Sequence, residues 1–195
     1  MGAEWQVWFM PTTPLAFRPL QANRRIHLCI ACFCIYKLEG ERIVRQLLKR
    51  YCVLRFSNVY GNAYDIPDRV IPKFVRTAQV GGELVLEGGE QIIDFTHIDD
   101  TVASIIQCMN LLQSERILQE TIHILPGVPN KITDIIGLLR NQGLQFTVRT
   151  NAPRSYDVQR FVGSTVRREQ LLGKRNFIRL EEGIRWTLRQ LSPKE

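Results

Sequence analysis

The sequence predicts an α/β fold, because short apolar runs that suit buried strands alternate with amphipathic helical segments. The composition is that of an ordinary folded protein, with 45% hydrophobic and 23% charged residues. No apolar run approaches the roughly 20 residues that a membrane-spanning helix needs. We therefore expect neither a membrane protein nor a membrane partner.

Residues 1–35 do not follow this alternation. The first 20 residues hold two tryptophans and three prolines, and they show no clear period. We expect residues 1–35 to be an atypical and poorly ordered N-terminus, or a foreign segment joined to a normal domain. The apolar run 26–36 could be a buried strand, part of a secretion signal or a poor membrane anchor. A signal is disfavoured because no small-residue cleavage site follows it.

A regular pattern begins at Tyr36. Apolar residues recur at helical spacing through residue 48, while charged residues take the other face, including the i,i+4 pair Glu41 and Arg45. Residues 52–54 then form a short apolar run that continues into Arg55-Phe56, and its length and β-branched content favour a buried strand of a parallel sheet. A polar loop that ends in Asn58-Val59-Tyr60-Gly61 follows.

The remaining elements alternate in the same way. Residues 62–68 suit a loop, residues 70–78 a helix, and Gly81-Gly82 its end. Further strands are expected at residues 84–86, 92–95, 122–125 and 145–150, and further helices at residues 101–112, 133–139, 166–172 and 180–191. We expect Asp99-Asp100 to cap the helix at 101–112.

Two groups of residues could suggest a metal site. The first is the run Cys29, Cys32 and Cys34, but no fourth ligand has zinc-site spacing. Reduced thiols packed among apolar neighbours are the preferred interpretation, and they fit a cytoplasmic protein. The second group is Asp94, His97, Asp99 and Asp100, for which helix capping and a histidine that alternates out of a strand are preferred. We expect no metal.

The formal net charge is +7. Basic residues occur only in short clusters, and no nucleic-acid-binding motif accompanies them. We therefore expect no nucleic-acid partner, although a basic surface suits an anionic, phosphate-bearing ligand.

Six segments occur in an order and spacing that resemble one known family: residues 37–44, 54–61, 70–75, 94–100, the region around Arg154 and Asp157, and 171–188. The chain from Lys37 onward resembles the C-terminal part of an extended short-chain dehydrogenase/reductase of the NAD-dependent epimerase/dehydratase type. The resemblance implies an incomplete Rossmann-type parallel sheet, comprising its last helix and strands, merged with the small α/β substrate domain over residues 36–195.

The family's catalytic pair is Y-x-x-x-K, in which the lysine lowers the pKa of the tyrosine and holds the nicotinamide ribose. Lys37 fits the lysine, but the tyrosine position is Phe33, which cannot exchange a proton. Tyr36 would point about 100° away around the helix, so it could serve only if the helix were distorted.

The resemblance also implies the remaining site residues. Cofactor contacts would come from Lys37, Phe56, Asn58 and Val59, and substrate contacts from Asn58, Val70, Arg154 and Asp157. Arg154 matches the second of two arginines that grip the nucleotide diphosphate, whereas the first arginine's position holds Ile93. The simpler alternatives are surface roles for Lys37 and Arg154, and a turn role for Asn58.

The implied cofactor is NAD or NADP, and the implied ligand is a UDP- or dTDP-sugar. Cofactor binding is expected to be impaired, because no G-x-x-G-x-x-G or G-x-G-x-x-G occurs in the chain. We interpret the chain as a truncated relative of nucleotide-sugar epimerases (isomerases) and dehydratases, with little or no activity. The alternatives are a non-catalytic module that binds sugar nucleotides or a partner, and a misjoined N-terminus. A homodimer through the lysine-bearing helix, common in the family, is a further expectation.

Overall fold

The structure is a computed structural model that describes the backbone of residues 6–11, 25–154 and 157–191, and side chains from residue 35 onward. The helices are α1 (Arg25–Leu47), α2 (Val70–Gln79), α3 (Ile98–Gln113), α4 (Ile132–Asn141), α5 (Val166–Leu172) and α6 (Leu180–Leu191). The strands are β1 (Gln6–Pro11), β2 (Tyr51–Phe56), β3 (Asn58–Tyr60), β4 (Glu83–Glu87), β5 (Ile92–Ile93), β6 (Phe95–His97), β7 (Gln119–Ile124), β8 (Asn130–Lys131), β9 (Thr147–Asn151) and β10 (Arg160–Phe161). The predicted α/β fold is confirmed.

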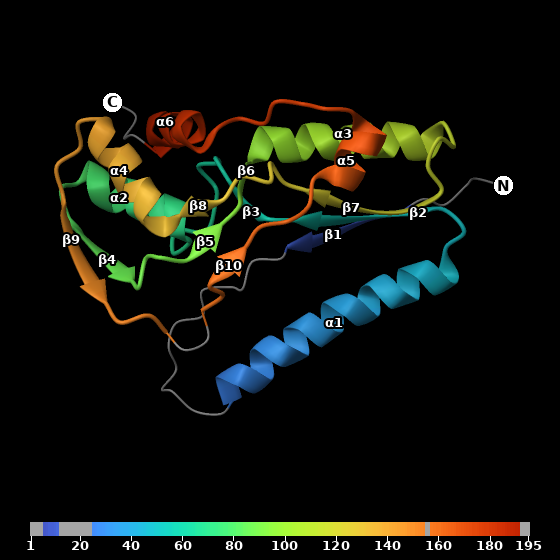
Figure 1. Cartoon of the computed structure of the whole chain (residues 1–195), viewed down its shortest axis with the longest axis horizontal. Coiled ribbons are helices and arrows are strands. Elements are labelled where there is room, and N and C mark those ends of the chain that lie inside the picture. Colours follow the sequence, from blue (N-terminus) through green and yellow to red (C-terminus); the bar gives the residue numbers. More distant parts are fainter. Residues whose placement is uncertain (1–5, 12–24, 155–156, 192–195) are drawn as a thin grey trace.

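A three-stranded parallel sheet in the order β1-β2-β7 forms one half of the molecule. The carboxyl ends of the strands are aligned, with Pro11 opposite Phe56 and Phe56 opposite Ile124. Helix α1 crosses one face of this sheet, while α3 and α5 lie on the other (Figure 1). This is the layered arrangement of a Rossmann-type sheet, in which both faces are covered.

The strand period of two separates the two faces of β2. Tyr51 and Val53 point to α1, where they pack with Val44. Cys52 and Leu54 point to the opposite face, in a buried cluster that also contains Cys108 and Leu112 of α3. Burial on both sides explains why residues 52–54 are consecutive apolar residues rather than an alternating pattern.

The second half gathers α2, α4 and α6 around short strands (Figure 1). Strand β4 pairs with β9 in parallel, and β5 lies between β10 and β8. One apolar core joins these helices, and its most buried members include Ile71, Leu84, Ile135, Leu139 and Ile184. The short parallel pair β3-β6 follows directly on β2 and leads into this half.

One alternative for the N-terminal region differs from the structure. The apolar run 26–36, for which a buried strand was one possibility, belongs to helix α1. Residues 6–11 form strand β1, while residues 1–5 and 12–24 of the N-terminus predicted to be poorly ordered lie outside the described residues. A short apolar run does not distinguish a strand from a buried helix by itself. Here the run continues without a break into the amphipathic segment after Tyr36, so one long helix forms.

Three smaller expectations were wrong. Asn58–Tyr60 is a strand rather than a polar loop, because its backbone pairs with β6. The expected strand 92–95 is interrupted at Asp94, between β5 and β6. The cap of α3 is His97, whose side chain accepts from the Asp99 backbone N–H, and His97 is only 1% exposed rather than turned outward. None of the described helices is long and apolar enough to cross a membrane.

Candidate functional site

Polar residues collect where the central strands end. Ser57 and Asn58 follow β2, and the turn at Gly127 follows β7. Ligands of open α/β sheets bind outside the carboxyl ends of the strands. Ser57 Oγ lies 2.5 Å from Thr96 Oγ1 of β6, and both residues are buried. This hydrogen bond fixes the start of β3 against β6 and thereby positions the Asn58 backbone.

Asp94 links the segments at this edge. Its carbonyl oxygen accepts the Asn58 N–H at 3.3 Å, and its own N–H donates to Phe161 O at 2.9 Å. Its carboxylate Oδ2 accepts the Gly127 N–H at 2.9 Å. Burial raises the pKa of Asp94 to about 6, although backbone N–H groups and Arg168 oppose the rise. Asp94 thus forms a structural junction between segments of the two halves.

Helix α1 carries the predicted catalytic positions. It is unbroken from Arg25 to Leu47, so residue 33 lies one turn before Lys37 on the same side of the helix. That position holds phenylalanine. Lys37 is half-buried, whereas Tyr36 is 73% exposed. The backbone therefore has no distortion of the kind that would bring Tyr36 onto the face of Lys37.

One turn after Lys37, Glu41 ties α1 to the sheet. Its carboxylate accepts two hydrogen bonds from Arg55 of β2, each 2.8 Å long. The predicted partner Arg45 also reaches Glu41, at 3.2 Å. Arg55 is the main cause of a lowered pKa at Glu41, which is 5% exposed. This network sets the height and rotation of α1 on the sheet, and hence the place of Lys37.

The other predicted cofactor residues lie close together in sequence but differ in exposure. Phe56 is the last residue of β2 and is buried in the core beneath α3. Asn58 and Val59 begin β3 and are half-buried. Val70 opens α2 and packs against the core of the second half. Of these four, Asn58 has a polar side chain, and it lies at the strand edge where a ligand is expected.

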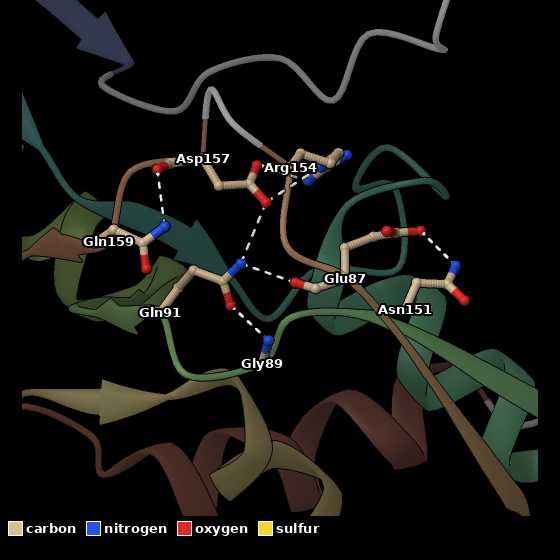
Figure 2. Close-up of polar contacts among 7 residues, drawn as sticks. All are labelled: Glu87, Gly89, Gln91, Asn151, Arg154, Asp157 and Gln159. Atoms are coloured by element: carbon tan, nitrogen blue, oxygen red, sulfur yellow. Dashed lines mark hydrogen bonds and ion pairs between the residues drawn. The ribbon is translucent and has the colours of Figure 1, made fainter.

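The predicted substrate residues Arg154 and Asp157 are in contact. The Arg154 Nε–H donates to both carboxylate oxygens of Asp157, at 3.1 and 3.2 Å, and Nη2 lies 3.0 Å from Oδ1 (Figure 2). The Arg154 side chain is 42% exposed and that of Asp157 is 11% exposed. A partly exposed guanidinium is a suitable binding group for phosphate, because its planar N–H groups match the geometry of phosphate oxygens.

The third partner in this contact is Gln91, which sequence reasoning missed. Its Nε2 donates to Asp157 Oδ2 at 3.2 Å, and the residue is only 7% exposed. The sequence holds one signal of it: a glutamine two residues after a Gly-Gly turn and directly before a strand. Asp94 was considered as a metal ligand, but its role as a junction was also missed.

A cleft of about 680 Å³ lies elsewhere, between α4 and the start of α6. Its lining includes Phe95, Val128, Leu138, Phe177 and Arg179. None of the predicted site residues lines it, so this cleft and the predicted ligand site are separate features of the surface.

Residues 31–119 match the sequence profile of a family described as NAD dependent epimerase/dehydratase. No curated protein matches the chain.

Several solved structures are similar. One is TunA, an NAD dependent NDP-hexosamine 5,6-dehydratase involved in tunicamycin biosynthesis, at 28% identity and a TM-score of 0.64, covering 75% of this chain and 46% of TunA. A second is MoeE5 in complex with UDP-glucuronic acid and NAD, at 25% identity and a TM-score of 0.64, covering 72% of this chain and 48% of MoeE5.

A third similar structure is the UDP-glucuronic acid 4-epimerase of Bacillus cereus, whose complex holds UDP-glucuronic acid and NAD. It is 21% identical, with a TM-score of 0.73 over 82% of this chain and 52% of the enzyme. At this identity the likeness shows the fold alone. The chain spans about half the length of the solved structures that it matches.

Proposed function

Because the chain is related to the NAD-dependent nucleotide-sugar epimerases and dehydratases of the extended short-chain dehydrogenase/reductase family, we propose that it binds a nucleotide sugar with little or no turnover. The ligand class is a UDP- or dTDP-sugar, and Arg154 contacts its diphosphate. The observation that carries the proposal is the Arg154–Asp157 pair, which holds a partly exposed guanidinium. The sequence resemblance assigns the diphosphate contact to this arginine.

The proposed contacts of the ligand are few. Arg154 meets the phosphates, with Asp157 and Val70 nearby in the family pattern, and Asn58 serves ligand and cofactor at the strand edge. A charge-assisted arginine–phosphate contact is among the stronger single contacts in proteins. Ile93 replaces a second arginine, so we expect weaker diphosphate binding than a site with two arginines would give.

The proposed lack of turnover rests on Phe33. Epimerisation and dehydration both begin with removal of a hydroxyl proton, and phenylalanine has no group that accepts one. Helix α1 places Phe33, rather than a tyrosine, one turn before Lys37. NAD or NADP is the proposed cofactor. We expect this chain alone to bind it weakly through Lys37, Phe56, Asn58 and Val59, because it contains no glycine-rich phosphate turn.

The activity half of the proposal is tested by incubating the purified chain with NAD and UDP-glucose, UDP-glucuronic acid or dTDP-glucose. We expect no epimerised or dehydrated product by chromatography or mass spectrometry. The matched variant Phe33→Tyr restores the hydroxyl; turnover in that variant alone would locate the defect at residue 33. Robust turnover by the natural chain would overturn the proposal.

A partner-binding role has its own supporting observation, on the outer side of α1. Tyr36, Ile43 and Leu47 share one stripe of the helix and are 73%, 43% and 74% exposed. We propose that this stripe mediates a homodimer. Light scattering should give twice the monomer mass, and Leu47→Glu should return the monomer; a monomer without the substitution would contradict this.

The buried free thiols Cys52 and Cys108 support the cytoplasm as the proposed compartment.

A further inference from the structure

Gln91 forms a buried bridge between the turn after β4 and the segment that carries Arg154. Its Oε1 accepts the Gly89 N–H at 2.8 Å, and its Nε2 donates to Glu87 O at 2.8 Å and to Asp157 Oδ2 at 3.2 Å (Figure 2). Both amide hydrogens and the carbonyl oxygen are therefore used. A side chain with all its groups bonded inside the protein has one orientation.

The turn itself fits closely against the segment before Arg154. Gly88 and Gly89 have φ angles of 76° and 101°, which side-chain-bearing residues rarely adopt. A Cβ on Gly88 would lie 2.9 Å from the Cβ of Pro153. The Gly88 N–H also donates to Asn151 O at 3.1 Å. The glycines thus bring the backbone of the turn against residues 151–153, directly before the arginine.

Asp157 connects Gln91 to Arg154, because its carboxylate is hydrogen-bonded to both side chains. One of its oxygens, Oδ2, accepts from both Gln91 and Arg154, while Oδ1 accepts from Arg154. Without the amide of Gln91, the Asp157 carboxylate would lose its hydrogen bond to the segment between β4 and β5. The distance between the Asp157 carboxylate and the Arg154 guanidinium also affects how strongly Arg154 attracts an anionic ligand, because the carboxylate partly offsets its positive charge.

We infer that Gln91 is a positioning residue for nucleotide-sugar binding, acting on Arg154 through Asp157. The inference rests on the proposed function, because it concerns the same diphosphate contact. It has a specific consequence in this chain, where Ile93 stands in place of a second arginine. A site with one arginine has no second contact to compensate when that arginine is misplaced, and small misplacements at a binding site are costly.

The test is a double-mutant cycle on UDP-glucose affinity, measured by titration calorimetry. Gln91→Met keeps the length of the side chain and removes its hydrogen bonds. We expect it to weaken binding roughly threefold to tenfold when Arg154 is present, and to have no further effect in an Arg154→Ala background. The matched control is Gln107→Met on α3, which loses one amide bond to Leu172 O (2.9 Å) and should leave affinity unchanged. Equal effects of Gln91→Met in both backgrounds would overturn the inference.

A second measurement tests, without a ligand, whether Gln91 positions Arg154. The Arg154 Nε–H resonance, assigned by its loss in Arg154→Lys, should shift in Gln91→Met and stay in place in Gln107→Met. An unchanged resonance in folded Gln91→Met would refute the positioning role, even where Arg154→Ala binds too weakly to measure. If the natural chain shows no UDP-glucose binding while the resonance does shift, the proposed function fails and the positioning contact survives.

Discussion

Asp94→Asn is expected to make the protein more stable at neutral pH. The Asp94 side chain lies in the junction between the two halves, where the residue is 0% exposed, and burial raises its pKa to about 6. Asparagine has nearly the same shape and keeps a carbonyl oxygen for the Gly127 N–H, which now donates at 2.9 Å. It carries no charge, so the cost of burying an ionised carboxylate disappears.

The magnitude follows from the pKa of Asp94 in the folded and the unfolded protein. An aspartate in an unfolded chain has a pKa of about 3.9, so the folded protein holds this proton more tightly. The favourable contribution of protonated Asp94 is complete below about pH 4 and is lost as the pH rises through about 6. The full difference corresponds to about 3 kcal/mol of unfolding free energy. Arg168, which favours the ionised form, would lose this partner in the variant.

Urea unfolding of the natural protein and Asp94→Asn between about pH 4 and about pH 7.5 measures this effect. We expect the stability of the natural protein, relative to the variant, to fall by about 2 kcal/mol over that range. Asp68→Asn removes an exposed carboxylate and serves as the matched control for the loss of one negative charge. A difference between Asp94→Asn and the natural protein that does not change with pH would refute the assignment of a raised pKa to Asp94.

Three further outcomes test other parts of the structure. Glu41→Gln should lower the unfolding free energy by about 1–2 kcal/mol in urea melts, because Arg55 loses its charged partner. Since the pKa of Glu41 is lowered in the folded protein, this loss is full at neutral pH and shrinks as the pH falls below about 4 and through that lowered pKa. Gly183→Ala should destabilise by about 1–3 kcal/mol in the same assay, because its Cβ would overlap the Tyr60 hydroxyl; an unchanged midpoint would contradict the packing of α6. Cys52, 1% exposed, should resist alkylation in the native protein and react after unfolding, as mass spectrometry would record.

Much of the fold was predictable because long elements carry their own pattern. The bounds of α5 and α6 match the expected residues 166–172 and 180–191, and β2 follows its apolar run. The misses involve partners distant in sequence. Strand β3 exists because it pairs with β6, and no local pattern in three residues reveals such pairing. The long helix α1 was divided because its apolar start and its amphipathic end carry different patterns.

The site was predictable only in part, and for the same reason. Arg154 and Asp157 are close in sequence, and their contact agrees with their assignment to one ligand site, although the binding role itself stays a prediction. Gln91 precedes Asp157 by 66 residues, so only the pairing of distant segments brings it to the carboxylate. His97 caps α3 in place of Asp99-Asp100, because it ends β6 buried with its ring nitrogen directed at the Asp99 N–H. An acidic pair before a helix indicates an N-terminus without naming the residue that caps it.

A calorimetric titration of UDP-glucose into the natural chain and into Arg154→Ala tests the proposed ligand site most directly. We expect saturable binding to the natural chain, about tenfold weaker binding to the variant, and no heat from uridine and glucose added together, because the diphosphate contact dominates. Absence of binding to the natural chain, or equal affinity for the two proteins, would contradict the proposed diphosphate contact.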